Sequence, residues 1–242
     1  MLTKNEPFIQ DTDKDKKDKA QNPVQYYVKF SFMITYILLL TTATVTLIEA
    51  LRTPVPHVRH IFNLETCISL VAGYFYSIFV GKIEEYGKAD KTIDWADITK
   101  TRYIDWAITT PIMLLVLSIV LGQNAKTPVK FPGLLLIIAL NYSMLYAGYL
   151  GENKQLDRNS AMVYGFIAFF IMFGVIFFTF LSNKFILANY ALYGFYVIIW
   201  SIYGIAFMMN EEYKNIIMNI LDCIAKCFIG LGLWVYYTKI IQ

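Results

Sequence analysis

Residues 100–122 read KTRYIDWAITTPIMLLVLSIVLG, a long apolar block with an arginine and an aspartate near its start. A helix of about 20 apolar residues is long enough to cross the hydrocarbon layer of a membrane, which is about 30 Å thick. The chain contains six more apolar blocks, at residues 27–51, 63–82, 131–151, 159–182, 185–209 and 214–240. The sequence therefore predicts an all-α fold in which a seven-transmembrane-helix bundle occupies residues 26–242.

The overall composition favours the same fold class. The 242 residues are 57% hydrophobic and only 16% charged, whereas soluble domains usually carry about 25% charged residues. Residues 1–25 are polar and mixed in charge, so we expect an arm outside the bundle rather than a secretion signal. The net charge of +3 comes without a basic stripe, so the predicted partner is the lipid bilayer and not a nucleic acid.

Seven spans place the two ends of the chain on opposite sides of the membrane. The loops after the first, third and fifth spans, together with the C-terminus, carry lysine and arginine but few acids. We take this acid-poor side as the cytoplasmic one, because cytoplasmic loops are enriched in lysine and arginine. The sequence thus predicts an extracellular N-terminal arm and a cytoplasmic C-terminus.

Four charged residues lie deep within the predicted spans: Arg102, Asp105, Asp222 and Lys226. Buried ionisable groups are costly unless they are paired, and here two cations balance two anions. The spacing of three residues in one pair and four in the other places each pair on one face of its helix. We therefore expect the four side chains to face the bundle interior and meet one another. A structural ion-pair cluster that fixes helix packing is the alternative.

A buried lysine among aromatic residues has a specific chemical use. In an apolar environment the neutral amine is favoured, and it can attack an aldehyde to form a Schiff base. Once protonated, that Schiff base needs a carboxylate counterion, and Asp105 and Asp222 are both available. The residues that suit a long, flat, apolar aldehyde are Trp106, Met113, Met144, Trp200, Tyr203 and Phe207.

Three motifs occur together and in order along the chain. They are RYIDWAITTP at 102–111, WSIYG at 200–204 and DCIAK at 222–226. In this combination they resemble helices C, F and G of the microbial (type 1) rhodopsins, close to the proteorhodopsin and viral-rhodopsin branches. The resemblance extends over residues 27–240. It implies a seven-helix bundle with all-trans retinal bound covalently to Lys226.

The same resemblance implies roles for the buried charges. Asp105 would be the primary counterion and proton acceptor, Asp222 the second counterion, and Arg102 a gating residue just outside them. Thr109 and Tyr76 would support the two carboxylates by hydrogen bonds. The retinal pocket would contain Trp106, Met113, Met144, Gly148, Trp200, Tyr203 and Phe207.

The chain also departs from the family pattern. The usual cytoplasmic proton donor is replaced by Val116, and the histidine that often pairs with the acceptor is replaced by Phe75. Gly204 stands where the family has a kink-forming proline. Glu65 is a candidate substitute donor, because helix geometry places it at about the same depth as Val116. The alternative for Glu65 is a solvated acid near the start of a helix, with Asn63 as a possible cap.

On the outer side, Glu211 and Glu212 lie where pumps of this family release protons, or they are simply solvated. The resemblance implies a photoreceptor and not an enzyme, with light-driven outward proton transport as the leading function. A homo-oligomer, a trimer or a pentamer, is expected. A light-gated ion channel and a photosensory rhodopsin are the alternatives. The channel is less favoured because Glu65 and Glu84 are expected at the ends of their helix, not in its middle.

Overall fold

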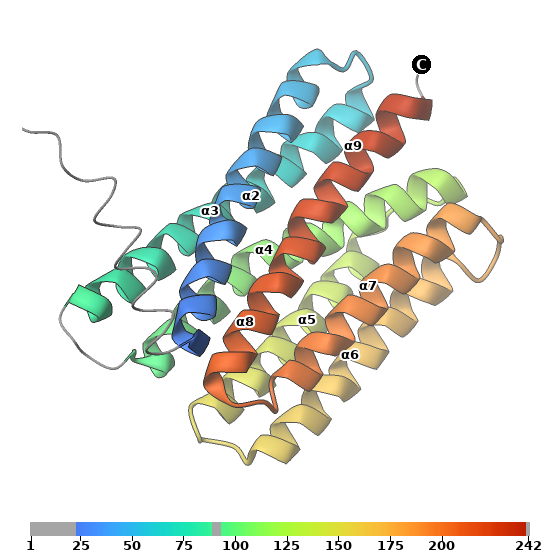
Figure 1. Cartoon of the computed structure of the whole chain (residues 1–242). Coiled ribbons are helices and arrows are strands. Elements are labelled where there is room, and N and C mark those ends of the chain that lie inside the picture. The colour runs from blue at the N-terminus through green and yellow to red at the C-terminus, as the bar shows by residue number, and fades with distance from the viewer. Residues whose placement is uncertain (1–22, 89–92, 241–242) are drawn as a thin grey trace, which may run out of the picture.

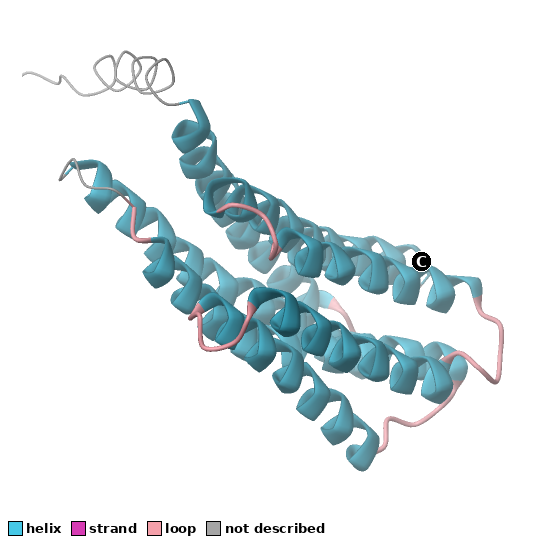
Figure 2. Ribbon diagram, turned by 90° about the horizontal axis from the view of Figure 1, so that it is seen from below, coloured by secondary structure: helices cyan, strands magenta, loops and turns pink. Residues whose placement is uncertain are grey.

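Seven helical rods make up the part of the chain that the computed structural model describes, residues 23–88 and 93–240 (Figure 1). The first six rods are α2 (Pro23–Arg52), α3 (Pro56–Lys88), α4 (Trp95–Ala125), α5 (Phe131–Glu152), α6 (Arg158–Phe180) and α7 (Leu187–Ala206). The seventh is continuous from α8 (Glu211–Asp222) through the π-helix η1 (Cys223–Phe228) to α9 (Ile229–Ile240). Every regular element in these residues is a helix (Figure 2), so the predicted all-α fold is confirmed.

The rods follow one another around the bundle and are joined by short connections. α2 packs on α3, α3 on α4, α4 on α5, and α5 on α6. The seventh rod closes the bundle because it contacts α2, α3 and α7. Figure 1 shows the start of α2 beside α8, and the end of α9 at the far end of the bundle. The two ends of the described chain therefore lie at opposite ends of the bundle.

Six of the rods are long and apolar enough to cross a membrane. The exception, α7, is the shortest rod, with 20 residues, and it contains four tyrosines and a tryptophan. Its position between α6 and the seventh rod nevertheless makes it part of the same bundle. Aromatic residues with polar atoms are suited to a helix that lines an internal cavity, because their hydroxyl and ring N–H groups then find partners.

The helix α3 is longer than the predicted span at 63–82. It begins at Pro56, a residue that fits the first turn of a helix because that position needs no backbone N–H, and it continues to Lys88. Asn63 therefore lies inside the helix and cannot cap it, and Glu65 is the tenth residue of the helix. The prediction of a helix start beside Glu65 was wrong. The first turns of α3 are polar and extend beyond the apolar block, so in the sequence they look like a loop.

The helix α4 and the seventh rod occupy the most enclosed positions. In each, 61% of the most apolar window is buried, against 17% in α5. The helix α4 starts cleanly because the side chain of Asp94 accepts hydrogen bonds from the backbone N–H groups of Ala96 and Asp97. The two helices that carry the four predicted charges are thus the two that the bundle surrounds most completely.

The polar arm predicted for residues 1–25 falls almost wholly outside the described residues. Residues 23–25 form the first turn of α2. The boundary of the arm stays a prediction.

Candidate functional site

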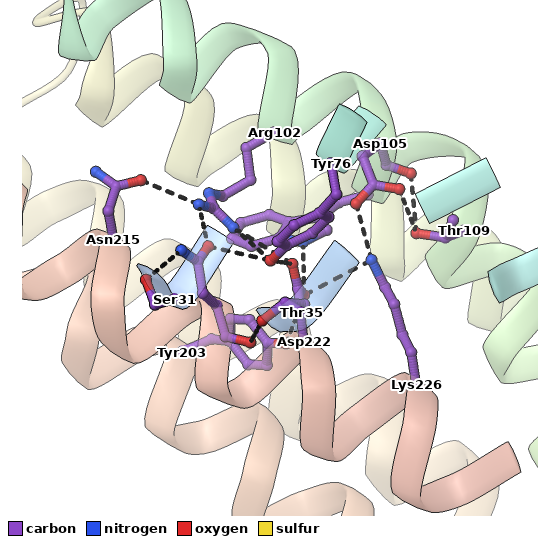
Figure 3. Close-up of polar contacts among 12 residues, drawn as sticks. Ser31, Thr35, Tyr76, Arg102, Asp105, Thr109, Tyr203, Asn215, Asp222 and Lys226 are labelled. Atoms are coloured by element: carbon purple, nitrogen blue, oxygen red, sulfur yellow. Dashed lines mark hydrogen bonds and ion pairs between the residues drawn. The ribbon is translucent and has the colours of Figure 1, made fainter. Parts of the chain in front are cut away.

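The four charges predicted to meet do so in the middle of the bundle (Figure 3). The Nζ atom of Lys226 lies 2.8 Å from Oδ2 of Asp105 and 3.6 Å from Oδ1 of Asp222. The guanidinium of Arg102 lies 3.3 Å from Oδ2 of Asp222. None of the four side chains is more than 2% exposed. Charges this deeply buried are tolerated because the cluster is neutral and each member has an opposite partner.

The two carboxylates differ in how many donors hold them. Asp222 accepts hydrogen bonds from the hydroxyls of Tyr76 and Tyr203, each at 2.7 Å, and from the indole N–H of Trp106 at 3.2 Å. Among the described residues, the carboxylate of Asp105 has as partners Lys226 and the hydroxyl of Thr109, which lies 3.4 Å from Oδ1. The negative charge is therefore held much more firmly on Asp222 than on Asp105.

Arg102 is fixed by amide groups that the sequence reasoning missed. Its Nη2 atom donates to Asn215 at 3.0 Å and to Asn219 at 2.7 Å. Its guanidinium also lies over the ring of Phe32, 5.3 Å from the centroid, an arrangement that favours a cation. The spacing along the seventh rod contained the signal, because residues 215, 219, 222 and 226 follow the four-three-four pattern of one helical face.

Lys226 lies in the π-helix η1, which interrupts the α-helical pattern between α8 and α9. A π turn inserts one extra residue into a helix and is frequently found at functional sites. Here it sets the rotation of the lysine relative to Asp222, which ends the preceding α-helix. The π-helix therefore lies at Lys226, the residue expected to form the Schiff base.

An apolar cavity of about 830 Å³, including its open mouth, extends from Lys226 between α4, α5, α6 and α7. All seven residues predicted for the retinal pocket line it: Trp106, Met113, Met144, Gly148, Trp200, Tyr203 and Phe207. The helix α6 adds lining residues that the sequence did not reveal: Ala161, Met162, Gly165, Phe166 and Phe169. A long apolar aldehyde fits this arrangement, because the amine stands at one end of a cavity lined mainly by apolar and aromatic side chains.

Two glycines of the cavity wall make room for aromatic side chains. A methyl group at Gly148 would lie 2.5 Å from the hydroxyl oxygen of Tyr103, and one at Gly204 would lie 2.6 Å from the ring of Phe166. A side chain at either position would require the aromatic ring to move. Gly204 stands at the position of the family's proline. The ring of Phe166, on α6, fills the space where a side chain at position 204 would lie.

Glu65 lies inside the bundle and is only 1% exposed. The alternative of a solvated acid was therefore wrong. Its Oε2 atom lies 3.1 Å from where a methyl group on Gly230 would sit, which places the carboxyl beside α9. Glu65 was expected at the end of its helix, which counted against a channel. Because Glu65 is buried within α3, that argument no longer holds. Its proximity to Val116, itself 1% exposed, stays a prediction.

A second ion cluster lies towards the end of the bundle where α8 begins. Lys214 is only 1% exposed and binds two carboxylates, Glu152 at 2.9 Å and Glu211 at 2.8 Å. Glu212, by contrast, makes no ion pair or hydrogen bond within the described residues. The sequence reading missed this cluster because Lys214 stands at the start of an apolar block and looked like a loop charge.

Comparisons with known proteins agree with this geometry. The family model described as bacteriorhodopsin-like protein matches residues 26–240. The crystal structure of viral rhodopsin OLPVRII is 42% identical, with a TM-score of 0.80, and the match covers 89% of this chain and 99% of that one. The proton pumping rhodopsin AR2 from the marine alga Acetabularia acetabulum is 20% identical, with a TM-score of 0.69, over 89% and 96% of the two chains. A search of curated proteins returned no match.

A membrane bundle that encloses a lysine between two carboxylates, at the end of an apolar cavity, defines a class of chromophore-binding membrane proteins. The chain belongs to the bacteriorhodopsin-like family, the microbial (type 1) rhodopsins, and to their viral branch. Members of this family bind retinal covalently through a lysine. The protein is therefore a multi-pass membrane photoreceptor that carries retinal.

Proposed function

We propose that the protein is a light-driven outward proton pump in which Lys226 carries the retinal. The observation that supports this most directly is the unequal support of the two carboxylates beside Lys226. Asp222 accepts hydrogen bonds from three uncharged donors and pairs with Arg102, so it serves as the fixed counterion. Asp105 is 2.8 Å from the lysine nitrogen and has one further side-chain donor, so it is the carboxylate that takes up a proton.

When bound, retinal supplies a light-driven change of shape that lowers the affinity of the lysine nitrogen for its proton. Asp105 then accepts that proton at Oδ2, the oxygen that faces the nitrogen. Thr109 keeps its hydrogen bond to Oδ1 and so holds the protonated carboxyl in place. Trp106 and Trp200 line the cavity and restrict how the chromophore moves, and Arg102 separates the two carboxylates from the outer end of the bundle.

The proposed outward direction of transport rests on the predicted orientation, in which the N-terminus lies outside the membrane. With the N-terminus outside, Arg102 and Asn215 lie on the extracellular side of Asp105, and Glu65 lies on the cytoplasmic side of Lys226. Asn215 accepts from Arg102 and donates to the backbone carbonyl of Glu211 at 2.8 Å. These contacts lead from the inner cluster to the backbone of Glu211, the residue whose carboxylate pairs with Lys214.

Of the two acids proposed for proton release, which form the start of α8, Glu211 has the connection that supports the role. We expect Glu211→Gln to delay the release of the proton to the outside, because its carboxylate is 38% exposed and belongs to the second ion cluster, with Lys214. Glu212→Gln is the matched control and should leave release unchanged. A pH-indicating dye outside sealed vesicles would record the timing after a flash. Equal timing in both variants would remove Glu211 from the pathway.

Glu65 is proposed as the donor that returns a proton to the site. We expect Glu65→Gln to slow the late recovery of the photocycle at least several-fold, because valine at position 116 cannot donate a proton. Flash photolysis of the ground-state absorption band measures this rate. Glu84→Gln, an exposed acid on the same helix, serves as control. Recovery of Glu65→Gln at the unmodified rate would exclude the donor role.

Electrical recording tests the function as a whole. A pump produces an outward photocurrent that persists at zero voltage in symmetric solutions. A channel, which the buried Glu65 keeps as the second candidate, produces a current that reverses at an ion's equilibrium potential. A photosensory rhodopsin completes its photocycle without a steady current. The proposal also includes a homo-oligomer, a trimer or pentamer, and a role in transport rather than in enzymatic catalysis.

A further inference from the structure

The helix α3 carries two buried polar atoms, one helical turn apart in sequence, that have no hydrogen-bond partner among the described residues. One is Oε1 of Glu65, and the other is Oγ of Ser69, whose residue is 0% exposed. Buried polar atoms are nearly always paired in folded proteins, so an unpaired atom calls for an explanation. The two residues are four apart on one helix, so their side chains are neighbours on the same face. A rotation of the Glu65 side chain can therefore bring Oε1 to the Ser69 hydroxyl.

The level of Ser69 along the bundle is given by contacts that its neighbours on α3 make on either side of it. Glu65, Ser69 and Tyr76 belong to one buried stripe of α3. At one end of the stripe, Tyr76 donates to Asp222, four residues before Lys226 on the seventh rod. At the other end, Glu65 lies against Gly230, four residues after Lys226. Ser69 thus lies on α3 between two contacts that bracket Lys226.

The carboxyl of Glu65 packs against α9 at a glycine, Gly230, where an added side chain would crowd it. A methyl group there would lie 3.0 Å from Cγ2 of Thr42 and 3.1 Å from Oε2 of Glu65, which is closer than nearly all real contacts of this kind. A methyl group added at the nearby Gly232 would have no atom of another described residue within 4 Å. Gly230 therefore leaves the space that the carboxyl occupies, and Gly232 has no comparable role.

We propose that Glu65, Ser69 and Gly230 form one proton-delivery site, in which Gly230 makes room for the carboxyl and the Ser69 hydroxyl passes its proton towards Lys226. The proton leaves Oε1 of Glu65 for Oγ of Ser69 while the hydroxyl proton of Ser69 moves on towards the lysine nitrogen. Glu65 is left as a carboxylate and is then reprotonated from the cytoplasmic side. No electrons change hands and no further reactant is needed. This inference rests on the proposed role of Glu65 as donor.

Flash photolysis of the full chain with retinal provides the first test. Ser69→Ala and Gly230→Ala should each slow late recovery by about tenfold, because proton transfer depends steeply on position. Ser69→Thr, which restores a hydroxyl, should recover at close to the unmodified rate, and Gly232→Ala should be unaffected. Azide, a small weak acid, should accelerate recovery in Ser69→Ala by delivering protons directly. If Ser69→Ala were slow only because the bundle packs poorly, azide would not restore its rate. The presence of a hydroxyl in Ser69→Thr would not matter either.

Infrared spectroscopy of the retinal-free protein provides a second test that does not depend on the photocycle. A protonated carboxyl band that disappears in Glu65→Gln should shift in Ser69→Ala and Gly230→Ala and stay in place in Gly232→Ala. If Glu65→Gln is slow but Ser69→Ala and Gly230→Ala recover normally and leave the band unchanged, this inference is wrong and the donor role stands. If Glu65→Gln itself recovers normally, the donor role fails first.

Discussion

The Lys226→Ala protein, expressed with all-trans retinal, is expected to show no visible absorption band and no light-driven current. The reason is chemical, because alanine has no amine to attack the aldehyde. Lys226 is also the one lysine among the residues that line the cavity in the described part of the chain. Absorption spectroscopy of the purified protein measures the effect directly. A visible band that survives in Lys226→Ala would overturn the assignment of the attachment site.

The control for this experiment is a second buried lysine. Lys214 is as enclosed as Lys226, at 1% exposure, but it binds Glu152 and Glu211 and does not line the cavity. Lys214→Ala should therefore keep the visible band. The comparison separates the loss of one particular amine from the general effect of removing a buried charge from the bundle, which alone can destabilise the fold.

The Asp105→Asn protein is expected to keep a visible band but to lose net proton transport by about a hundredfold or more, the range in which a positioned acid or base contributes. The amide is nearly the same size as the carboxyl, so the cavity stays intact, but it cannot take up the proton of the lysine nitrogen 2.8 Å away. The photocurrent at zero voltage measures the loss. Transport at the unmodified rate in Asp105→Asn would assign the acceptor role to another group.

Asp97→Asn is the matched control on the same helix. Asp97 pairs with Lys82 at 2.6 Å and its side chain is 42% exposed, so it lies outside the buried cluster. Its substitution should leave the current unchanged. Asp222→Asn is not a suitable control, because it would disturb the partners of Tyr76, Tyr203 and Trp106 at once.

The buried charges and the cavity were predictable from the sequence because the membrane makes such residues costly. An arginine, a lysine and two aspartates inside apolar blocks demand partners, and the structure places them together as the sequence predicts. The aromatic residues of the pocket followed from the motifs around them, and the cavity contains all of those predicted. The functional roles assigned to these residues stay predictions until the variants are measured.

Other parts of the site could not be read in the same way. Asn215 and Asn219 carry no charge, so their burial does not stand out, although they hold Arg102. Glu65 and Lys214 lie near the ends of apolar blocks, where a charge is usually solvated. Their burial depends on where neighbouring helices end, which is a property of the packed bundle. The wall formed by α6 was equally hidden, because one apolar face of a membrane helix looks like another.

The contact between Gly204 and Phe166 has a mechanical consequence. Because the ring of Phe166 fills the space beside Gly204, α6 and α7 interlock at this level. A hydrogen bond also connects α6 and α7 further along, where the Tyr193 hydroxyl donates to the backbone carbonyl of Phe173. If one helix slid past the other, the ring of Phe166 would have to leave the space beside Gly204. We therefore expect α6 and α7 to move together when the chromophore pushes on Trp200.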